Sequence, residues 1–201
     1  MSKHNCWEER YKTENTPWDV GKPDFNLTSI VTKRPIGVCK ALEIGCGTGD
    51  NAVWLAHRNF IVTGSDVSDI AIQKAIEKAS NTDLKCAFVV ADFLKDEISG
   101  APFGFIFDRG CFHSFDSDKE RKRFAENVAS HLEKGGLWLS IIGSADDLPR
   151  DHGPPRRTAR DIVVAVEPCF VILSLHSSHF DSNRPRPPKA WVCLMQKRNR
   201  A

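Results

Sequence analysis

The stretch "EIGCGTGD", residues 43–50, constrains the fold of this chain more than any other. It follows an apolar run, precedes apolar residues at helical spacing, and carries glycine at alternate positions, Gly45, Gly47 and Gly49. Glycine allows a tight turn between a strand and a helix and lets the backbone approach a ligand closely. We therefore expect an α/β sheet that binds a nucleotide-like ligand at the carboxyl ends of its strands.

Strand-like and helix-like segments alternate through the first two thirds of the chain. We expect strands at 38–44, 61–65, 86–90, 103–107 and 137–142, with helices at 50–58 and after a cap at Ser68. Ser117 and Glu120 form a capping box that opens a longer helix. The glycines of "EKGG", residues 133–136, are expected to end that helix. This order is typical of a parallel sheet with helices on both faces.

The last third of the chain changes character. Residues 146–157 are rich in proline and charge and predict a loop, which is followed by a short helix at 158–167. Two strand-like runs, 170–175 and 190–195, are joined by a proline-rich segment that is too short for a crossover helix. We therefore expect them to form an antiparallel hairpin at one edge of the sheet.

Acidic residues around the glycine turn indicate which kind of nucleotide is bound. The dinucleotide fingerprint GxGxxG has a third glycine at its sixth position, where this chain has Asp50. A carboxylate at the start of that helix would repel a pyrophosphate, and Glu43 adds negative charge inside the strand end. Together they favour a phosphate-free nucleoside that carries a positive centre.

Two more acidic residues end the following strands. Asp66 lies 21 residues after Gly45, where a carboxylate can accept both ribose hydroxyls. Asp92 ends the third strand, where it can reach an adenine amino group with Phe93 beside the ring. A sulfonium-bearing adenosine with an amino-acid tail meets all of these demands.

Five motifs in order resemble those of class I S-adenosylmethionine-dependent methyltransferases: "EIGCGTGD", "GSDVS", "ADF", "FDRGCFH" and "EKGGLWLSI". The resemblance covers about residues 39–142 and, through the hairpin, most of the chain. It implies a Rossmann-like, doubly wound, mainly parallel seven-stranded sheet with an antiparallel C-terminal strand, and S-adenosylmethionine as the cofactor. The expected cofactor-binding residues are Trp18, Glu43, Gly45, Cys46, Gly47, Gly49, Asp66, Val67, Asp92, Phe93 and Asp108.

The N-terminal stretch "WEERYKTENTPWDVGKP", residues 7–23, resembles the lid of the subgroup that contains thiopurine, halide, thiol and tellurite-resistance methyltransferases. The resemblance implies a small-molecule acceptor, often methylated at sulfur or another soft heteroatom. Trp18 is expected to cover the sulfonium through cation–π attraction, with Tyr11 and Pro17 in the same lid. For Trp7, a place in the lid and a role in anchoring the N-terminus are both open.

The segment "DRGCFHSF", residues 108–115, follows the fourth strand, where family members place substrate-facing residues. Arg109 is a candidate to orient the cofactor or an anionic substrate. His113 is a candidate general base, because its unperturbed pKa is near neutrality, and structural packing against the lid is an equal alternative. Cys111 is expected only to pack, since methyl transfer needs no covalent enzyme intermediate. Arg156 and Arg157 are expected in a solvated loop, with an anionic substrate as the alternative partner.

Composition narrows the remaining possibilities. The formal net charge of +2 does not indicate a nucleic-acid partner, and the apolar stretch 162–175 is interrupted and too short to span a membrane. Seven cysteines without a CxxC motif favour reduced thiols in the cytoplasm and no metal site.

We expect one cytoplasmic, monomeric domain over residues 1–201 that acts on a small molecule. Its expected parts are an N-terminal lid and approach segment (1–34), a cofactor-binding core (38–142), and a substrate-side loop, short helix and hairpin (143–201). Two alternatives remain open: a cofactor-binding module that activates a catalytic partner, and a nicotinamide-dependent oxidoreductase, which Asp50 disfavours.

Overall fold

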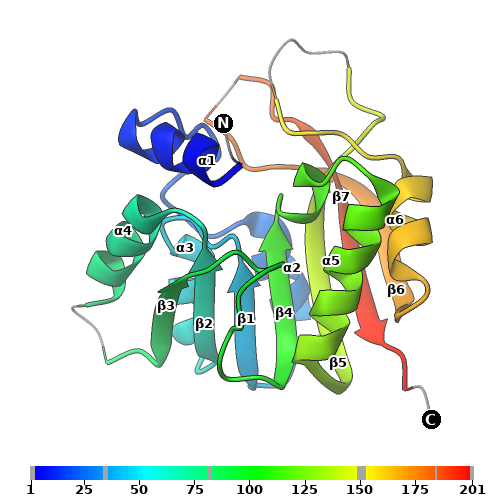
Figure 1. Ribbon diagram of the computed structural model, residues 1–201, viewed down its shortest axis with the longest axis horizontal. Helices are drawn as coiled ribbons and strands as arrows, with labels where there is room; N and C mark the ends of the chain where they lie inside the picture. The colour runs from blue at the N-terminus through cyan, green and yellow to red at the C-terminus, as the bar shows by residue number, and fades with distance from the viewer. Residues whose placement is uncertain (1–2, 34–35, 81–82, 149–152, 184, 200–201) are drawn as a thin grey trace.

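A single mixed sheet forms the centre of the molecule (Figure 1). The computed structural model describes residues 3–33, 36–80, 83–148, 153–183 and 185–199. Within these ranges the sheet has seven strands in the order β3-β2-β1-β4-β5-β7-β6. The strands are β1 (Lys40–Ile44), β2 (Ile61–Asp66), β3 (Cys86–Val90), β4 (Phe103–Arg109), β5 (Leu132–Gly143), β6 (Phe170–His179) and β7 (Lys189–Lys197).

The pairing of the strands confirms the expected fold class. Strands β1 to β5 pair in parallel, while β7 pairs antiparallel with both β5 and β6. The predicted C-terminal hairpin is present and lies at one edge, and its second strand is inserted between β5 and β6. All five parallel strands therefore direct their carboxyl ends to the same side of the molecule.

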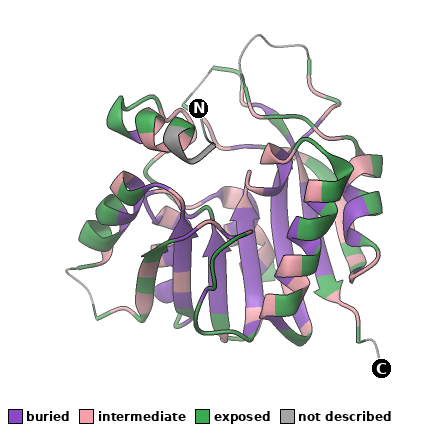
Figure 2. Cartoon of the chain, viewed as in Figure 1, coloured by how far each residue is buried: buried purple, intermediate pink, exposed green. Residues whose placement is uncertain are grey.

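Helices cover both faces of the sheet, as the alternation of segments predicts. They are α1 (Lys3–Lys12), α2 (Phe25–Lys33), α3 (Asp50–Ala56), α4 (Asp69–Ala79), α5 (Asp118–His131) and α6 (Ala159–Val166), with a 3₁₀ turn, η1, at Phe112–Ser114. Helices α5 and α6 bury Phe124 and Ile162 on one face, and α2 and α3 bury Leu27 and Leu55 on the other. The central strands are buried along almost their whole length (Figure 2), as expected for parallel strands covered on both sides.

Capping side chains begin the helices where the sequence predicts. The Ser68 side chain accepts a hydrogen bond from the Ala71 N–H at 3.1 Å, which starts α4. Ser117 and Glu120 form the predicted capping box at the start of α5, and Thr158 caps α6 in the same way. Each cap satisfies backbone donors that the helix itself leaves without partners.

The end of α5 differs from the prediction. The helix ends at His131, and Leu132 already has extended backbone angles (φ −87°, ψ 145°). Leu132 is buried and pairs with Phe103 of β4, so the "EKGG" segment belongs to β5 and not to a helix C-cap. The left-handed conformation of Gly135 (φ 71°) instead serves an irregular stretch of β5, where the register with β4 shifts.

Several strand boundaries differ from the predicted ones, among them those of β1 and β4. Strand β1 begins at Lys40, and Val38 is 63% exposed and outside the sheet. Strand β4 continues to Arg109, two residues beyond the predicted end. Asp108 and Arg109 are therefore fixed by strand geometry and do not lie in a loop.

The N-terminal segment lies across the carboxyl ends of the strands, where Figure 1 shows α1 above the sheet and beside α4. Helix α2 instead packs on the sheet through Leu27 and Val31 and belongs to the core. The part that covers the sheet edge is thus shorter than the expected lid and approach segment. Among the described residues, no helix has the length and apolar character that a membrane span requires.

Candidate functional site

A cavity of about 680 Å³ lies at the carboxyl ends of the parallel strands, beneath α1. All of the candidate cofactor-binding and catalytic residues named from the sequence line its walls, apart from Gly49 and Asp108. The structure therefore brings together side chains from the N-terminal segment, from four strand ends and from the segment after β6.

The glycine turn forms the floor of the cavity. Gly45, Gly47 and Gly49 all have left-handed backbone conformations, with φ of 68°, 54° and 83°. A Cβ on Gly47 would lie 2.8 Å from the Tyr11 hydroxyl, so the turn and the N-terminal segment approach each other closely. A Cβ on Gly49 would lie 2.9 Å from Ala75, which shows that Gly49 allows α4 to pack behind the turn.

Glu43 is fully buried beside this turn. Its Oε1 accepts a hydrogen bond from Asn51 Nδ2 at 2.8 Å, while its Oε2 has no hydrogen-bond partner among the described residues. Burial raises the pKa of the Glu43 carboxyl to about 8. A buried carboxylate oxygen without a donor, on the wall of a cavity, fits the ammonium group of an amino-acid tail.

Asp66 ends β2 on the same wall. Its Oδ2 accepts the Gly47 N–H and its Oδ1 accepts the Ser68 N–H, both at 2.9 Å. Each carboxylate oxygen can accept a second hydrogen bond, so both remain able to receive a ribose hydroxyl. The backbone bonds fix the orientation of the carboxylate, which suits it to a bidentate contact with a ribose.

Asp92 and Phe93 follow β3 at the edge of the cavity. Asp92 accepts hydrogen bonds from Leu94 N at 3.1 Å and Lys95 Nζ at 2.6 Å. The Phe93 ring is buried and packs edge-on against Phe124, with 5.2 Å between the ring centroids. A base that enters here would meet an apolar ring next to a carboxylate, as the sequence predicts, and would share that carboxylate with Lys95.

Asp50, which we expected to repel a pyrophosphate, forms an ion pair in the structure. Lys78 Nζ lies 2.5 Å from Asp50 Oδ1 and also donates to Thr48 Oγ1 at 3.3 Å. This ion pair from α4 compensates the carboxylate at the start of α3. The paired Asp50 therefore presents less negative charge than the sequence suggests, which weakens our inference from Asp50 against a pyrophosphate.

Asp108 has a structural position outside the cavity. It is fully buried and accepts hydrogen bonds from the backbone N–H groups of Cys111 and Phe112 and from Trp138 Nε1. These bonds shape the turn after β4 and hold Trp138 in the core. The geometry gives no support to the predicted contact between Asp108 and a cofactor.

Arg109 joins three distant segments. Its Nε donates to Asp24 Oδ2 at 2.7 Å, its Nη1 to Trp18 O at 3.2 Å, and its Nη2 to Asp181 O at 2.7 Å. Asn51 in turn connects Asp24 to the glycine turn, because it accepts the Asp24 N–H at 2.8 Å. With these three donors engaged, Arg109 positions the N-terminal segment, and its predicted contact with the cofactor or an anionic substrate stays a prediction.

His113 lines the cavity but is unsuited to the role of general base. The Gly143 N–H donates to its Nδ1 at 2.8 Å. Burial, followed by the charges of Arg157 and Arg109, lowers the pKa of the imidazole to about 3. The imidazole is therefore neutral near pH 7. Neither of the two roles that the sequence suggests, general base or structural packing against the lid, describes these contacts fully.

The aromatic lid is present and contains a cation that we did not predict. Trp7 and Trp18 meet edge-to-face at 5.4 Å, and Trp18 Nε1 donates to the Tyr11 hydroxyl at 3.2 Å. The Arg10 guanidinium lies 4.7 Å from the Trp18 ring centroid and 5.8 Å from that of Trp7. The sequence could have indicated this contact, because residues three apart on a helix, such as Trp7 and Arg10, are neighbours on its surface. The Arg10 guanidinium therefore already makes a cation–π contact with Trp18, the ring that we expected to cover a sulfonium.

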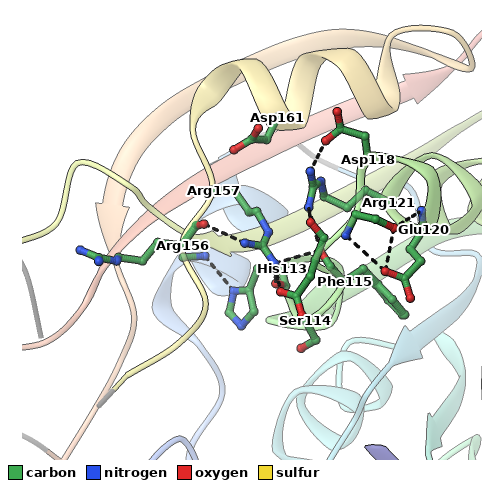
Figure 3. Close-up of polar contacts among 12 residues, drawn as sticks. His113, Ser114, Phe115, Asp118, Glu120, Arg121, Arg156, Arg157 and Asp161 are labelled. Atoms are coloured by element: carbon green, nitrogen blue, oxygen red, sulfur yellow. Dashed lines mark hydrogen bonds and ion pairs between the residues drawn. The ribbon is translucent and has the colours of Figure 1, made fainter. Parts of the chain in front are cut away.

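Two arginines hold the segment that carries His113 (Figure 3). Arg157 Nη2 donates to His113 O at 2.7 Å, Phe115 O at 2.9 Å and Asp116 Oδ1 at 2.9 Å. Arg121 Nη1 donates to Phe115 O at 2.8 Å and Asp116 O at 2.7 Å. Arg157 is thus largely buried and structural, which corrects the expectation that it lies in a solvated loop; only its neighbour Arg156 is exposed.

Within the part of the chain that the structure describes, no group of three or more metal-ligating side chains is found. None of the cysteines there forms a disulfide. The site therefore consists of a glycine turn, buried carboxylates, a neutral histidine and an aromatic lid.

The fold, the glycine turn after β1 and the acidic strand ends together resemble those of class I S-adenosylmethionine-dependent methyltransferases. A family model described as "Methyltransferase domain" matches residues 41–136. S-adenosylmethionine is the cofactor of this class, and the glycine turn, Glu43 and Asp66 fit it.

The chain is also similar to named methyltransferases, and it spans about two thirds of the length of these relatives. The chain is 30% identical over 151 residues to probable thiol methyltransferase 2 of Arabidopsis thaliana, a match that covers 74% of this chain and 65% of that protein. It is 27% identical over 168 residues to thiocyanate methyltransferase 1 of Brassica oleracea, covering 80% and 72%. A solved structure described as "Conversion of a Disulfide Bond into a Thioacetal Group during Echinomycin Biosynthesis" has the same fold, with a TM-score of 0.86 and 24% identity over 100% of this chain and 93% of that one.

Proposed function

We propose that this protein transfers a methyl group from S-adenosylmethionine to a small-molecule acceptor, a thiol or another soft heteroatom, by in-line displacement. The observation that carries the proposal is the pairing of Glu43 and Asp66 on one cavity wall beside the glycine turn. The names of the thiol and thiocyanate methyltransferases that the chain resembles support the acceptor class.

Each wall residue has a defined task in this proposal. Glu43 would hold the ammonium group of the cofactor, Asp66 its ribose hydroxyls, and Asp92 with Phe93 its base. When bound, S-adenosylmethionine supplies a methyl group already activated by a sulfonium. The remaining work of the protein is to hold donor and acceptor collinear and to exclude water.

The N-terminal segment is suited to the exclusion of water. Tyr11 is buried against the glycine turn, and Trp18 is fixed both by Tyr11 and, through its carbonyl, by Arg109. In this proposal the segment would cover the cavity with aromatic side chains that have defined positions. Reaction chemistry that is sensitive to hydrolysis or to loose geometry benefits from such closure.

Calorimetry tests the choice of cofactor. We expect the protein to bind S-adenosylhomocysteine and not NAD, and then to methylate members of a panel of small thiols when supplied with S-adenosylmethionine. Tight NAD binding without a response to S-adenosylhomocysteine would reject the proposal. Binding of S-adenosylhomocysteine without transfer to any acceptor would favour a cofactor-binding module instead.

A further inference from the structure

The two ring nitrogens of His113 have different surroundings. Nδ1 accepts the Gly143 N–H at 2.8 Å, which requires a lone pair on that nitrogen. A neutral imidazole whose Nδ1 is an acceptor carries its proton on Nε2. Nε2 has no hydrogen-bond partner among the described residues, and it lies against Gly110, another wall residue, whose Cβ would be 3.1 Å away.

The neighbours of His113 keep the ring neutral. Both charged groups that act on it are cations: Arg157, which donates to His113 O at 2.7 Å, and Arg109. Phe180 packs edge-on against the ring with 5.8 Å between centroids. No described carboxylate accepts a hydrogen bond from the ring, so nothing there stabilises the imidazolium that a general base would become.

The imidazole ring is also held in this orientation. A Cβ on Gly143 would lie 2.2 Å from Pro155 O and 3.3 Å from His113 Nδ1, so backbone packs tightly around the Nδ1 side. Arg157 donates to the carbonyl of His113 and Arg121 to that of Phe115 just after it, as Figure 3 shows. Rotation of the ring would leave the Gly143 N–H buried without an acceptor.

Two other acidic wall residues near Arg109 are already engaged. Asp24 is 1% exposed and pairs with Arg109 Nε at 2.7 Å. Asp181 pairs with Lys22 Nζ at 3.4 Å and accepts the Phe25 N–H at 3.4 Å. Tyr11 stays protonated, because burial raises the pKa of its phenol.

We propose that His113 Nε2–H is a fixed hydrogen-bond donor to the acceptor atom, and that the acceptor binds as an anion already ionised in solution, an inference that rests on the proposed function. In the transfer step, a lone pair on the acceptor sulfur forms the new S–C bond. The methyl C–S bond of the donor breaks, and its electron pair stays on the donor sulfur. No proton changes place, so the enzyme needs no base.

The pH dependence of wild-type activity provides a test that requires no variant. We would measure kcat/KM at saturating S-adenosylmethionine for an aryl thiol, an alkyl thiol and thiocyanate. For each thiol, the value should rise with pH up to the pKa of that thiol and then level off, while thiocyanate should give a flat profile. A common inflection shared by both thiols and absent with thiocyanate would identify an enzyme base and overturn the inference.

Variants at His113 separate donation from proton abstraction. His113→Gln keeps an N–H donor near Nε2 and should leave the KM for thiocyanate within about threefold, while His113→Leu should raise it by at least about tenfold, as loss of a hydrogen bond to a charged group predicts. His57→Gln, at an exposed histidine after α3, is the matched control. If both His113 variants keep thiocyanate methylation but lose thiol methylation, His113 is a base. Absence of transfer to every acceptor in the wild type rejects the proposed function, and this inference with it.

Discussion

Glu43 makes cofactor binding depend on pH in a way that can be calculated. Its pKa is raised to about 8 by burial, so about nine tenths of the molecules carry a protonated Glu43 at pH 7. Only the ionised form can pair with the ammonium group of the cofactor. Binding at pH 7 should therefore release close to one proton from this carboxyl.

The size of the effect follows from the fraction of molecules that can bind. The apparent dissociation constant rises by the inverse of that fraction, which is about tenfold at pH 7 and about a hundredfold at pH 6 for a pKa of about 8. Affinity for S-adenosylhomocysteine should thus increase steeply from pH 6 to pH 7.5. Above about pH 8 it should stop rising, because the amino group of the ligand begins to lose its own proton.

Calorimetry in two buffers of different ionisation enthalpy measures both quantities. Glu43→Gln should remove the proton release and the pH dependence, and should weaken binding at pH 8 by at least about tenfold through loss of a charge-assisted hydrogen bond. Glu77→Gln, at an exposed position on α4, is the control. Equal wild-type affinity at pH 6 and pH 8, with no proton released, would refute the assignment of Glu43 to the ammonium group.

The same carboxyl affects stability without ligand. Its folded-state pKa of about 8 lies above the ordinary value of 4.5, so between these values the folded protein binds more protons than the unfolded protein. Stability contributed by protonated Glu43 is fully present below about pH 4.5 and is lost as pH rises toward 8. Glu43→Gln should lose less stability than the wild type over this window in urea unfolding.

Three further changes test other parts of the site. Asp66→Ala should weaken S-adenosylhomocysteine binding by at least about tenfold without unfolding the protein, and exposed Asp69→Ala should not; unchanged affinity would place the ribose elsewhere. Deletion of residues 1–21 should lower the rate of methyl transfer by at least about tenfold, with a smaller effect on thermal stability. In the full chain, tryptic cleavage after Lys12 should slow when S-adenosylhomocysteine is added. Full activity of the truncated chain would argue against a lid. Gly143→Ala places a Cβ 2.2 Å from Pro155 O, so it should destabilise the folded protein by about 1–3 kcal/mol. It should also raise the KM for the acceptor more than the dissociation constant of the cofactor. Gly37→Ala, where a Cβ would enter open space, should leave stability and both constants unchanged.

Local signals account for the parts of the fold that the sequence predicts. Apolar periodicity and the caps at Ser68 and Ser117 identify the elements, because each depends on residues only a few positions apart. "EKGG" misleads for the same reason: the local glycine signal resembles a helix end, while the pairing of Leu132 with Phe103 across the sheet decides the outcome.

Distant partners explain what the sequence does not reveal about the site. Glu43 and Asp66 follow from their places after strands, since parallel strands end at one edge of a sheet. The roles of Arg109 and His113 depend instead on Asp24, Asp181 and Gly143, which lie between 30 and 85 residues away along the chain. A motif shows that such residues are near a cleft, but it does not show which of their atoms are already engaged.

The contacts of Arg109 also limit which segments of this protein can be exchanged with those of its relatives. One guanidinium holds Trp18 and Asp24 from before the sheet and Asp181 from after β6, over separations of up to 91 residues. A chimera that exchanges only the N-terminal segment would keep the Asp24–Arg109 ion pair only if an arginine stands at the same position at the end of β4. We therefore expect that a chimera keeps the position of the N-terminal segment only when it exchanges this segment, the end of β4 and the stretch after β6 together.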